Sequence, residues 1–324
     1  MPELLALSSA LCFGVTHFVN GLVSRRYAGV VVAAYAQVGG TAVSLLLLAA
    51  PTGSATAQAV CWGAISGLGT GIGVAFLYRA MQRAPMSVVV PTSDVGAVTL
   101  PVAFGIALLG ERPSPLALGG IVASIPAIWL VSAGERASRS APMSSNSALR
   151  RRNRCSHAHR WFSEVVLRRQ SGDPAARRRD PHRQRRASGG RGVPDALIAG
   201  TGFAVQFIGM GQVPAGTGWW PIIVSRIVSV VLIGALLAAT TGARRLPAKP
   251  AATALLAGAI GTVAIILYLL ATTQQMMAVA VVLAALYPAI PVILALLLLD
   301  ERISRAQLLG LLCAAATIAL LSLT

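Results

Sequence analysis

Charge is missing from long stretches of this 324-residue chain. No charged residue occurs between Tyr27 and Tyr78 or between Pro250 and Leu299, and 11% of all residues are charged whereas 55% are hydrophobic. A water-soluble protein of this size covers its surface with charged and polar groups along its whole length. Both stretches are also far longer than the roughly 20 apolar residues that cross a bilayer once. The composition therefore excludes a water-soluble fold and predicts a protein embedded in lipid.

Cysteine and histidine are scarce as well. The four cysteines show no paired spacing and three of them lie in apolar segments, so we expect neither disulfides nor a metal centre. Cys155, His157 and His159 lie close together, but their alternating spacing in a polar segment does not favour one tetrahedral site. We predict no cofactor and no catalytic residues.

The apolar segments predict ten transmembrane helices. Runs of Leu, Ala and Val lack the alternation of barrel strands, and every backbone amide in lipid needs an internal partner, so we expect helices. In the first half they span residues 4–23, 29–50, 59–81, 86–109 and 115–132. In the second half they span residues 195–213, 219–240, 252–272, 276–299 and 305–323. The predicted fold class is all-α integral membrane.

One passage of the chain occurs twice. LLGERPSPLALGG at residues 108–120 returns as LLDERISRAQLLG at residues 298–310. A shift of 190 residues aligns the two halves without a gap and superposes, among others, Phe13 on Phe203, Tyr78 on Tyr268, Pro101 on Pro291 and Glu111 on Glu301. Because each half has an odd number of helices, the second copy must enter the membrane from the opposite side. We therefore predict two five-helix inverted repeats, residues 1–134 and 193–324, with a shared site near the midplane.

The duplicated Glu-Arg turn has a simple structural interpretation. It follows the fourth helix of each half at the membrane surface, where charges remain solvated. Ser114 and Ser304 are placed to cap the next helix by accepting a hydrogen bond from its first amides. We predict a topology marker and cap rather than a catalytic role.

Residues 135–192 form a linker of different composition. Sixteen arginines lie between Ala133 and Gly192. We expect this linker to be disordered, and two interpretations stay open: a solvated basic segment that binds anionic lipid headgroups, or a segment read in a shifted frame of a GC-rich gene. A nucleic-acid partner is not expected, because the segment has no fold signature and few aromatic residues.

Arginine placement predicts an orientation. The loops that contain Arg25 and Arg26, Arg83, and Arg244 with Arg245 fall on one side of the predicted bundle, whereas Arg112 falls on the other. By the positive-inside rule the first side, together with the linker, faces the cytoplasm.

Three ionisable residues lie well inside predicted spans: His17, Asp94 and Arg226. Such residues are costly in lipid unless paired or hydrated, so each is a candidate for substrate binding or coupling. An unpaired Asp94 favours its protonated form in lipid and can exchange a proton near neutrality. The alternative is a structural ion pair of Asp94 with Arg226 or His17. Arg226 itself either holds helices together or contacts a substrate carboxylate.

Prolines and tyrosines mark the expected site. We predict helix breaks at a cavity where prolines interrupt the fourth and ninth spans, at Pro91, Pro101, Pro288 and Pro291. Tyr287 lies beside Pro288, and Tyr78 and Tyr268 are equivalent to each other in the two halves. These tyrosines either line the cavity or pack against neighbouring helices. The alternating glycines of the third span, at 67, 69, 71 and 73, favour close helix approach rather than a phosphate loop.

These features resemble the EamA-type transporters of the drug/metabolite transporter superfamily. The resemblance rests on the duplicated turn with its small-residue-rich following helix, and on the segments CFGVTHFVNG, YRAMQRAPMSVVVP and WWPIIVSRIVSV. It implies secondary transport of small metabolites, often efflux, through a central cavity lined by both repeats. The long linker and Asp94 depart from the family pattern, and the family's usual placement of both termini in the cytoplasm conflicts with the arginine distribution.

The leading hypothesis is therefore a multi-pass carrier of the cell inner membrane. It would export or exchange a small organic metabolite or drug by alternating access, with proton coupling as one option, and its expected partners are that small molecule and the lipid bilayer. The alternative is an integral-membrane enzyme acting on a lipid-linked substrate, although the turn acids lack a histidine partner. A channel is disfavoured because no ring-forming polar filter is present.

Overall fold

The computed structural model describes residues 2–49, 53–84, 86–140, 181–240, 245–290 and 305–322. These residues are helical apart from short connections, and none of them forms a strand. The first half contains α1 (Pro2–Ser24), α2 (Gly29–Leu46) with the 3-10 helix η1 (Leu47–Ala49), α3 (Ala57–Arg83), α4 (Met86–Leu108) and α5 (Pro115–Ser140). The second half contains α8 (Pro181–Gly211), α9 (Trp220–Ala238), α10 (Ala248–Thr272), α11 (Met277–Ala284) and α13 (Arg305–Ser322). The predicted all-α class is confirmed for this part of the chain.

Six of these helices are long and apolar enough to cross a membrane. They are α1, α2 together with η1, α3, α8 from Gly192 onward, α9 and α10. Shorter apolar segments lie within α4, α5 and α13, at Thr92–Leu108, Pro115–Leu130 and Leu308–Leu320. The described residues thus give a multi-pass arrangement, whereas the full count of ten spans stays a prediction.

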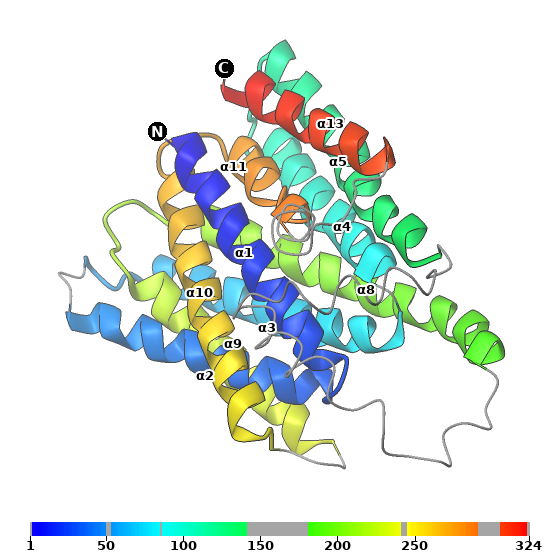
Figure 1. The fold of residues 1–324 in the computed structure, drawn as a ribbon. Coiled ribbons are helices and arrows are strands. Elements are labelled where there is room, and N and C mark those ends of the chain that lie inside the picture. Colours follow the sequence, from blue (N-terminus) through cyan, green and yellow to red (C-terminus); the bar gives the residue numbers. More distant parts are fainter. Residues whose placement is uncertain are drawn as a thin grey trace, which may run out of the picture.

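Helices that are distant in the sequence lie side by side (Figure 1). In the first half, α3 packs against α8 and α9 of the second half. In the second half, α10 packs against α1 and α2 of the first, and α5 pairs with α13. The two halves are therefore interleaved, and the space between α1, α2, α3 and α8, α9, α10 is bounded by both.

Glycines let α3 approach its two neighbours closely. A Cβ at Gly67 would lie 2.5 Å from the backbone oxygen of Ser225 in α9, and a Cβ at Gly73 would lie 2.8 Å from the ring of Phe203 in α8. Gly63 and Gly69 meet the backbone of the same two helices. Small residues replace side-chain bulk with backbone contact, which is how helices associate in lipid. The close-packing interpretation of this glycine stripe is confirmed.

Two of the predicted helix breaks are wrong. The helix α4 runs from Met86 to Leu108 and passes through Pro91 and Pro101 without interruption. Each proline removes one backbone hydrogen bond, but the helical dihedral angles continue on both sides, which membrane helices tolerate. The ninth predicted span, 276–299, does lose its helical form: α11 ends at Ala284, and turns cover residues 285–288 around Pro288. Pro291 lies outside the described residues.

Both ends of the predicted linker, residues 135–192, lie in helices. Helix α5 continues to Ser140, and α8 begins at Pro181, so residues 135–140 and 181–192 are helical rather than disordered. Arginine, alanine and glutamine are good helix formers, so a helix can continue beyond its apolar part. The remainder of the linker, with Cys155, His157 and His159, lies outside the described residues, as does the second Glu-Arg turn.

Candidate functional site

A narrow cavity lies between the two halves of the chain. Three helices of the first half line it, α1, α2 and α3, and three of the second half, α8, α9 and α10. Its volume is about 30 Å³, and the empty space amounts to about 360 Å³ when the open region at its mouth is included. Clefts that bind small molecules are typically concave, mostly apolar and furnished with a few polar groups. The lining residues fall into a polar group and an aromatic group.

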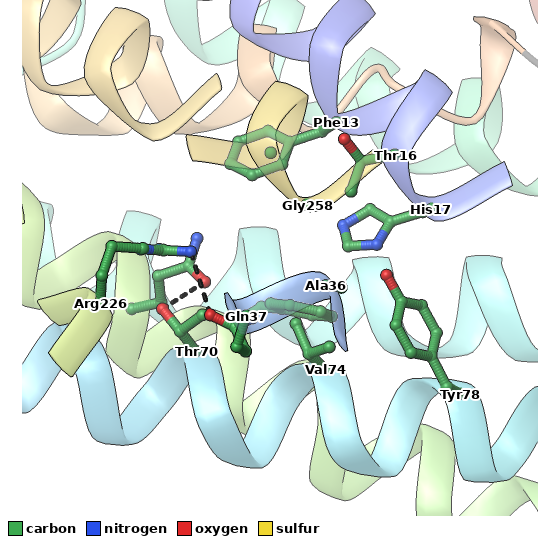
Figure 2. A pocket seen from close by; sticks show the side chains of 13 residues that line it. Phe13, Thr16, His17, Ala36, Gln37, Thr70, Val74, Tyr78, Arg226 and Gly258 are labelled. Carbon is green, nitrogen blue, oxygen red and sulfur yellow. Dashed lines mark hydrogen bonds between the residues drawn. The ribbon is translucent and has the colours of Figure 1, made fainter. Parts of the chain in front are cut away.

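Arg226 dominates the polar group (Figure 2). It lies in the middle of α9 and is 4% exposed. One terminal nitrogen of its guanidinium donates a hydrogen bond to Oε1 of Gln37 at 3.3 Å, and its Nε has no hydrogen-bond partner. Among the described residues no carboxylate lies within ion-pairing distance of Arg226. The guanidinium is therefore a buried cation on the cavity wall, and the described part of the chain supplies no counter-charge to it.

Thr70 and Gln206 complete the polar group. The Thr70 hydroxyl lies 2.8 Å from Oε1 of Gln206 and 2.9 Å from the carbonyl oxygen of Ser66. A hydroxyl has one hydrogen, so it donates to one of these oxygens at a time. This contact joins α3 to α8 across the boundary between the two halves.

His17 is the centre of the aromatic group. Its ring stacks on Phe13 with the centroids 5.9 Å apart and lies 5.4 Å from the Phe203 ring and 6.3 Å from the Tyr78 ring. In Figure 2, His17 and Tyr78 lie at the opposite end of the view from Arg226. Nδ1 of His17 is buried without a hydrogen-bond partner. The cavity thus has a cationic polar end and an aromatic end.

Asp94 is fully buried but is not part of the cavity wall. Neither of its carboxylate oxygens has a hydrogen-bond partner, although the carboxylate faces the Tyr287 hydroxyl closely enough to interact. The Tyr287 ring lies 5.1 Å from the His17 ring, so Tyr287 stands between Asp94 and the aromatic end. Asp94 forms no ion pair with Arg226 or His17, and the alternative of a structural ion pair is therefore wrong. None of the described residues that line the cavity belongs to α4.

Tyr78 and Tyr268 have different surroundings despite their equivalent positions. Tyr78 lines the cavity. The Tyr268 hydroxyl donates to the carbonyl oxygen of Phe207 at 3.1 Å, its ring lies 4.8 Å from the Phe207 ring, and it does not line the cavity. Tyr268 is thus a buried packing residue, whereas the structure brings Tyr78, His17 and Arg226 to one cavity with Asp94 and Tyr287 behind its aromatic end.

Glu111 makes a contact that the sequence did not predict. Its carboxylate accepts hydrogen bonds from the backbone amides of Met277 at 2.8 Å and Ala278 at 3.1 Å, the first two residues of α11. Gly105 lies against this carboxylate and leaves no room for a Cβ. Ser114 in the same turn accepts from the amide of Ala117 at 3.1 Å, which confirms the predicted cap of α5. The turn of one half therefore caps a helix of the other half.

A second unpredicted contact joins the halves near the start of α8. Asp195 is 5% exposed and pairs with Arg83 at 2.8 Å and Arg79 at 3.4 Å. Arg79 and Arg83 thus share one carboxylate. No local pattern announces the pair, because 112 residues separate Arg83 from Asp195.

Comparisons with known proteins identify relatives of this fold. The profile of the EamA-like transporter family matches residues 1–133 and 191–323. Nineteen chains of solved structures are similar, and one of them, titled "Crystal structure of protein", superposes with a TM-score of 0.66 at 15% identity, covering 99% of this chain and 96% of that one. At this identity the likeness concerns the fold alone. A search of curated proteins finds no match.

Proposed function

Because the chain belongs to the EamA-like transporter family, we propose that it is a secondary transporter that moves a small organic solute by alternating access. The observation that carries the proposal is the cavity, which is lined by three helices from each half and contains Arg226, whose guanidinium forms no ion pair with any described residue. A site at the boundary of two repeats is exposed to one side or the other when the repeats rock against each other.

The helix contacts support two related halves. Under the 190-residue shift, α1 corresponds to α8, α2 to α9, α3 to α10 and α4 to α11. The contact of α3 with α8 then has its counterpart in that of α10 with α1, and the contact of α4 with α8 has its counterpart in that of α11 with α1. This exchange is what a two-fold relation between the halves requires, and it supports the proposal of two related repeats. We further propose that these are inverted five-helix repeats that give ten spans in the cell inner membrane.

Asp94 is the proposed coupling residue. Its carboxylate is buried without a hydrogen-bond partner, and Tyr287 lies between it and the His17 ring. A carboxylate that exchanges a proton near the cavity would link a proton gradient to the position of α4 and of the broken segment after α11. The expected direction is export or exchange.

Transport in proteoliposomes tests this function. Purified protein is reconstituted and assayed with a panel of carboxylates, amines, amino acids, nucleosides and sugar conjugates, with and without a pH gradient. We expect saturable uptake of at least one class, and accumulation that follows the gradient if protons are coupled. Empty liposomes provide the background, and uptake no faster than that background for every class would contradict the proposal.

The enzyme alternative has no support from the site. The turn carboxylate of Glu111, which a membrane-surface enzyme would use, is engaged with the two amides of α11.

A further inference from the structure

We infer that the cavity selects an organic anion, namely a carboxylate with an aromatic or other apolar body and without an ammonium group. This inference rests on the proposed function of the same cavity and names its substrate class. Four features of the wall carry it: the charge of Arg226, its unbonded N–H groups with the NH₂ group of Gln37, the aromatic end, and the lack of acids among the described residues that line the cavity.

The charge of Arg226 calls for an anion. A buried guanidinium is costly unless its charge is balanced and its N–H groups are bonded. Arg226 has a single hydrogen bond, to Gln37, and no carboxylate partner among the described residues. The guanidinium offers five N–H donors in a planar fork that matches a carboxylate. An anion at this end of the cavity would supply both the missing charge and the missing acceptors.

Gln37 adds donors to the same end. Because a guanidinium only donates, the amide oxygen of Gln37 must face Arg226, and its NH₂ group is directed elsewhere. The Thr70 hydroxyl lies nearby on α3 (Figure 2). Gly40 brings α2 close to α10 beside this end, since a Cβ at that position would lie 2.5 Å from Oγ1 of Thr262 and 3.6 Å from Cδ of Arg226. The Thr70 hydrogen is already donated to Gln206 or Ser66, so the donors of this end are the N–H groups of Arg226 and the NH₂ group of Gln37, which suit an anionic group better than a cationic one.

The opposite end suits an apolar body. A wall of aromatic rings surrounds His17 there. The ring centroids of Phe13, Phe203 and Tyr78 lie 5.4 to 6.3 Å from the ring centroid of His17. Val74 continues this wall on α3. Aromatic side chains gain from burial and from offset or edge contact with another ring. A ligand whose carboxylate reaches Arg226 would place its body against these rings.

An ammonium group has no place in this cavity. None of the residues that line it is an aspartate or a glutamate. Asp94 is fully buried and outside the wall. A cationic ligand would be repelled by Arg226, and none of the described lining residues is an acid that could offset this repulsion, so amines are disfavoured. In a zwitterion, the repulsion of the ammonium group cancels part of the binding free energy that its carboxylate contributes. Selectivity should therefore decrease from carboxylate to zwitterion to amine.

Ligand binding tests the inference independently of transport. The purified protein in lipid nanodiscs is titrated calorimetrically with 3-phenylpropionate, phenylalanine and phenethylamine, which share a ring and differ in charge. We expect 3-phenylpropionate to bind at least about tenfold more tightly than phenethylamine, because a charge-assisted hydrogen bond is worth about a factor of ten or more, and phenylalanine to bind with an affinity between the two. Equal or tighter binding of phenethylamine would overturn the inference. This comparison of probes requires no protein variant.

Variants localise the binding. Arg226→Gln should weaken 3-phenylpropionate by about ten- to a hundredfold while leaving phenethylamine unchanged or stronger. Arg245→Gln removes an exposed arginine of the same half, outside the cavity, and serves as the matched control. Arg226→Lys keeps the charge without the fork and provides a folded alternative if Arg226→Gln is not recovered. Unchanged 3-phenylpropionate affinity in Arg226→Gln would overturn the inference; if only Arg226→Lys is recovered, the affinity order of the three probes on the unaltered protein decides.

The proposed function can fail separately. If 3-phenylpropionate binds at Arg226 but no panel solute crosses proteoliposomes, the carboxylate site stands and transport is wrong. If uptake is found only for amines or uncharged solutes, transport stands and the carboxylate site is wrong.

Discussion

Removing the carboxylate of Glu111 should release the first turn of α11. Both hydrogen bonds run from backbone amides that have no acceptor within their own helix, because the first amides of a helix point away from it. The distances of 2.8 and 3.1 Å are those of good charge-assisted bonds. The helix dipole adds to the attraction, since a carboxylate is favourable at a helix N-terminus.

The magnitude follows from these contacts. Hydrogen bonds to charged groups contribute about 1.5–3 kcal/mol each, but Glu111 is only half-buried and water competes with it. We therefore expect Glu111→Ala to cost about 1–2 kcal/mol in the opening of α11, comparable to the loss of an N-cap. That cost corresponds to a factor of about 5–30 in the open population. Glu111→Gln keeps one acceptor oxygen, so its free energy of α11 opening should lie between those of the unaltered protein and of Glu111→Ala.

Hydrogen exchange of the Met277 and Ala278 amides measures this effect. Glu111→Ala should accelerate their exchange, and Gly105→Ala should do the same by displacing the carboxylate that it contacts. Ser114→Ala is the matched control, because it removes the cap of α5 from the same turn and leaves α11 untouched. Unchanged exchange in Glu111→Ala, or equal acceleration in Ser114→Ala, would refute the capping role.

Three further predictions concern coupling, packing and orientation. Asp94→Asn should abolish accumulation driven by a pH gradient but retain exchange in proteoliposomes, and uphill transport with an unchanged pH profile would exclude Asp94 as the coupling residue. Gly67→Ala should destabilise the protein by about 1–3 kcal/mol in thermal unfolding because its Cβ meets the backbone of α9, whereas Gly234→Ala, with open space around it, should be neutral or better. A single cysteine in the Arg25–Arg26 loop should resist an impermeant reagent on intact cells; ready labelling would reverse the predicted orientation.

The arrangement of the fold could be predicted to a large extent because its signals are local or periodic. Uncharged runs longer than a bilayer predicted the helices, and their bounds agree within a few residues for α1, α3 and α9. The alternating glycines of α3 predicted close packing, because a missing side chain has a direct steric consequence. The residues that line the cavity were partly predicted as well, since a charged group such as Arg226 is rare inside lipid.

Contacts across the two halves could not be predicted. Glu111 was interpreted within its own turn, although its partners Met277 and Ala278 are 166 and 167 residues away. Asp195 gave no signal of its pairing with Arg83. Pro91 was expected to break α4, but a proline sets only its own geometry and the neighbouring residues decide whether the helix continues.

Access to the cavity from both membrane faces tests alternating access most directly. Val74 is 6% exposed and lines the cavity, so a cysteine there, in a background without the four native cysteines, can be reached only through it. Right-side-out and inside-out vesicles are treated with an impermeant maleimide, with and without the best solute of the transport panel. We predict labelling from either face, with the solute slowing both reactions. Labelling from one face alone under every condition would contradict a carrier.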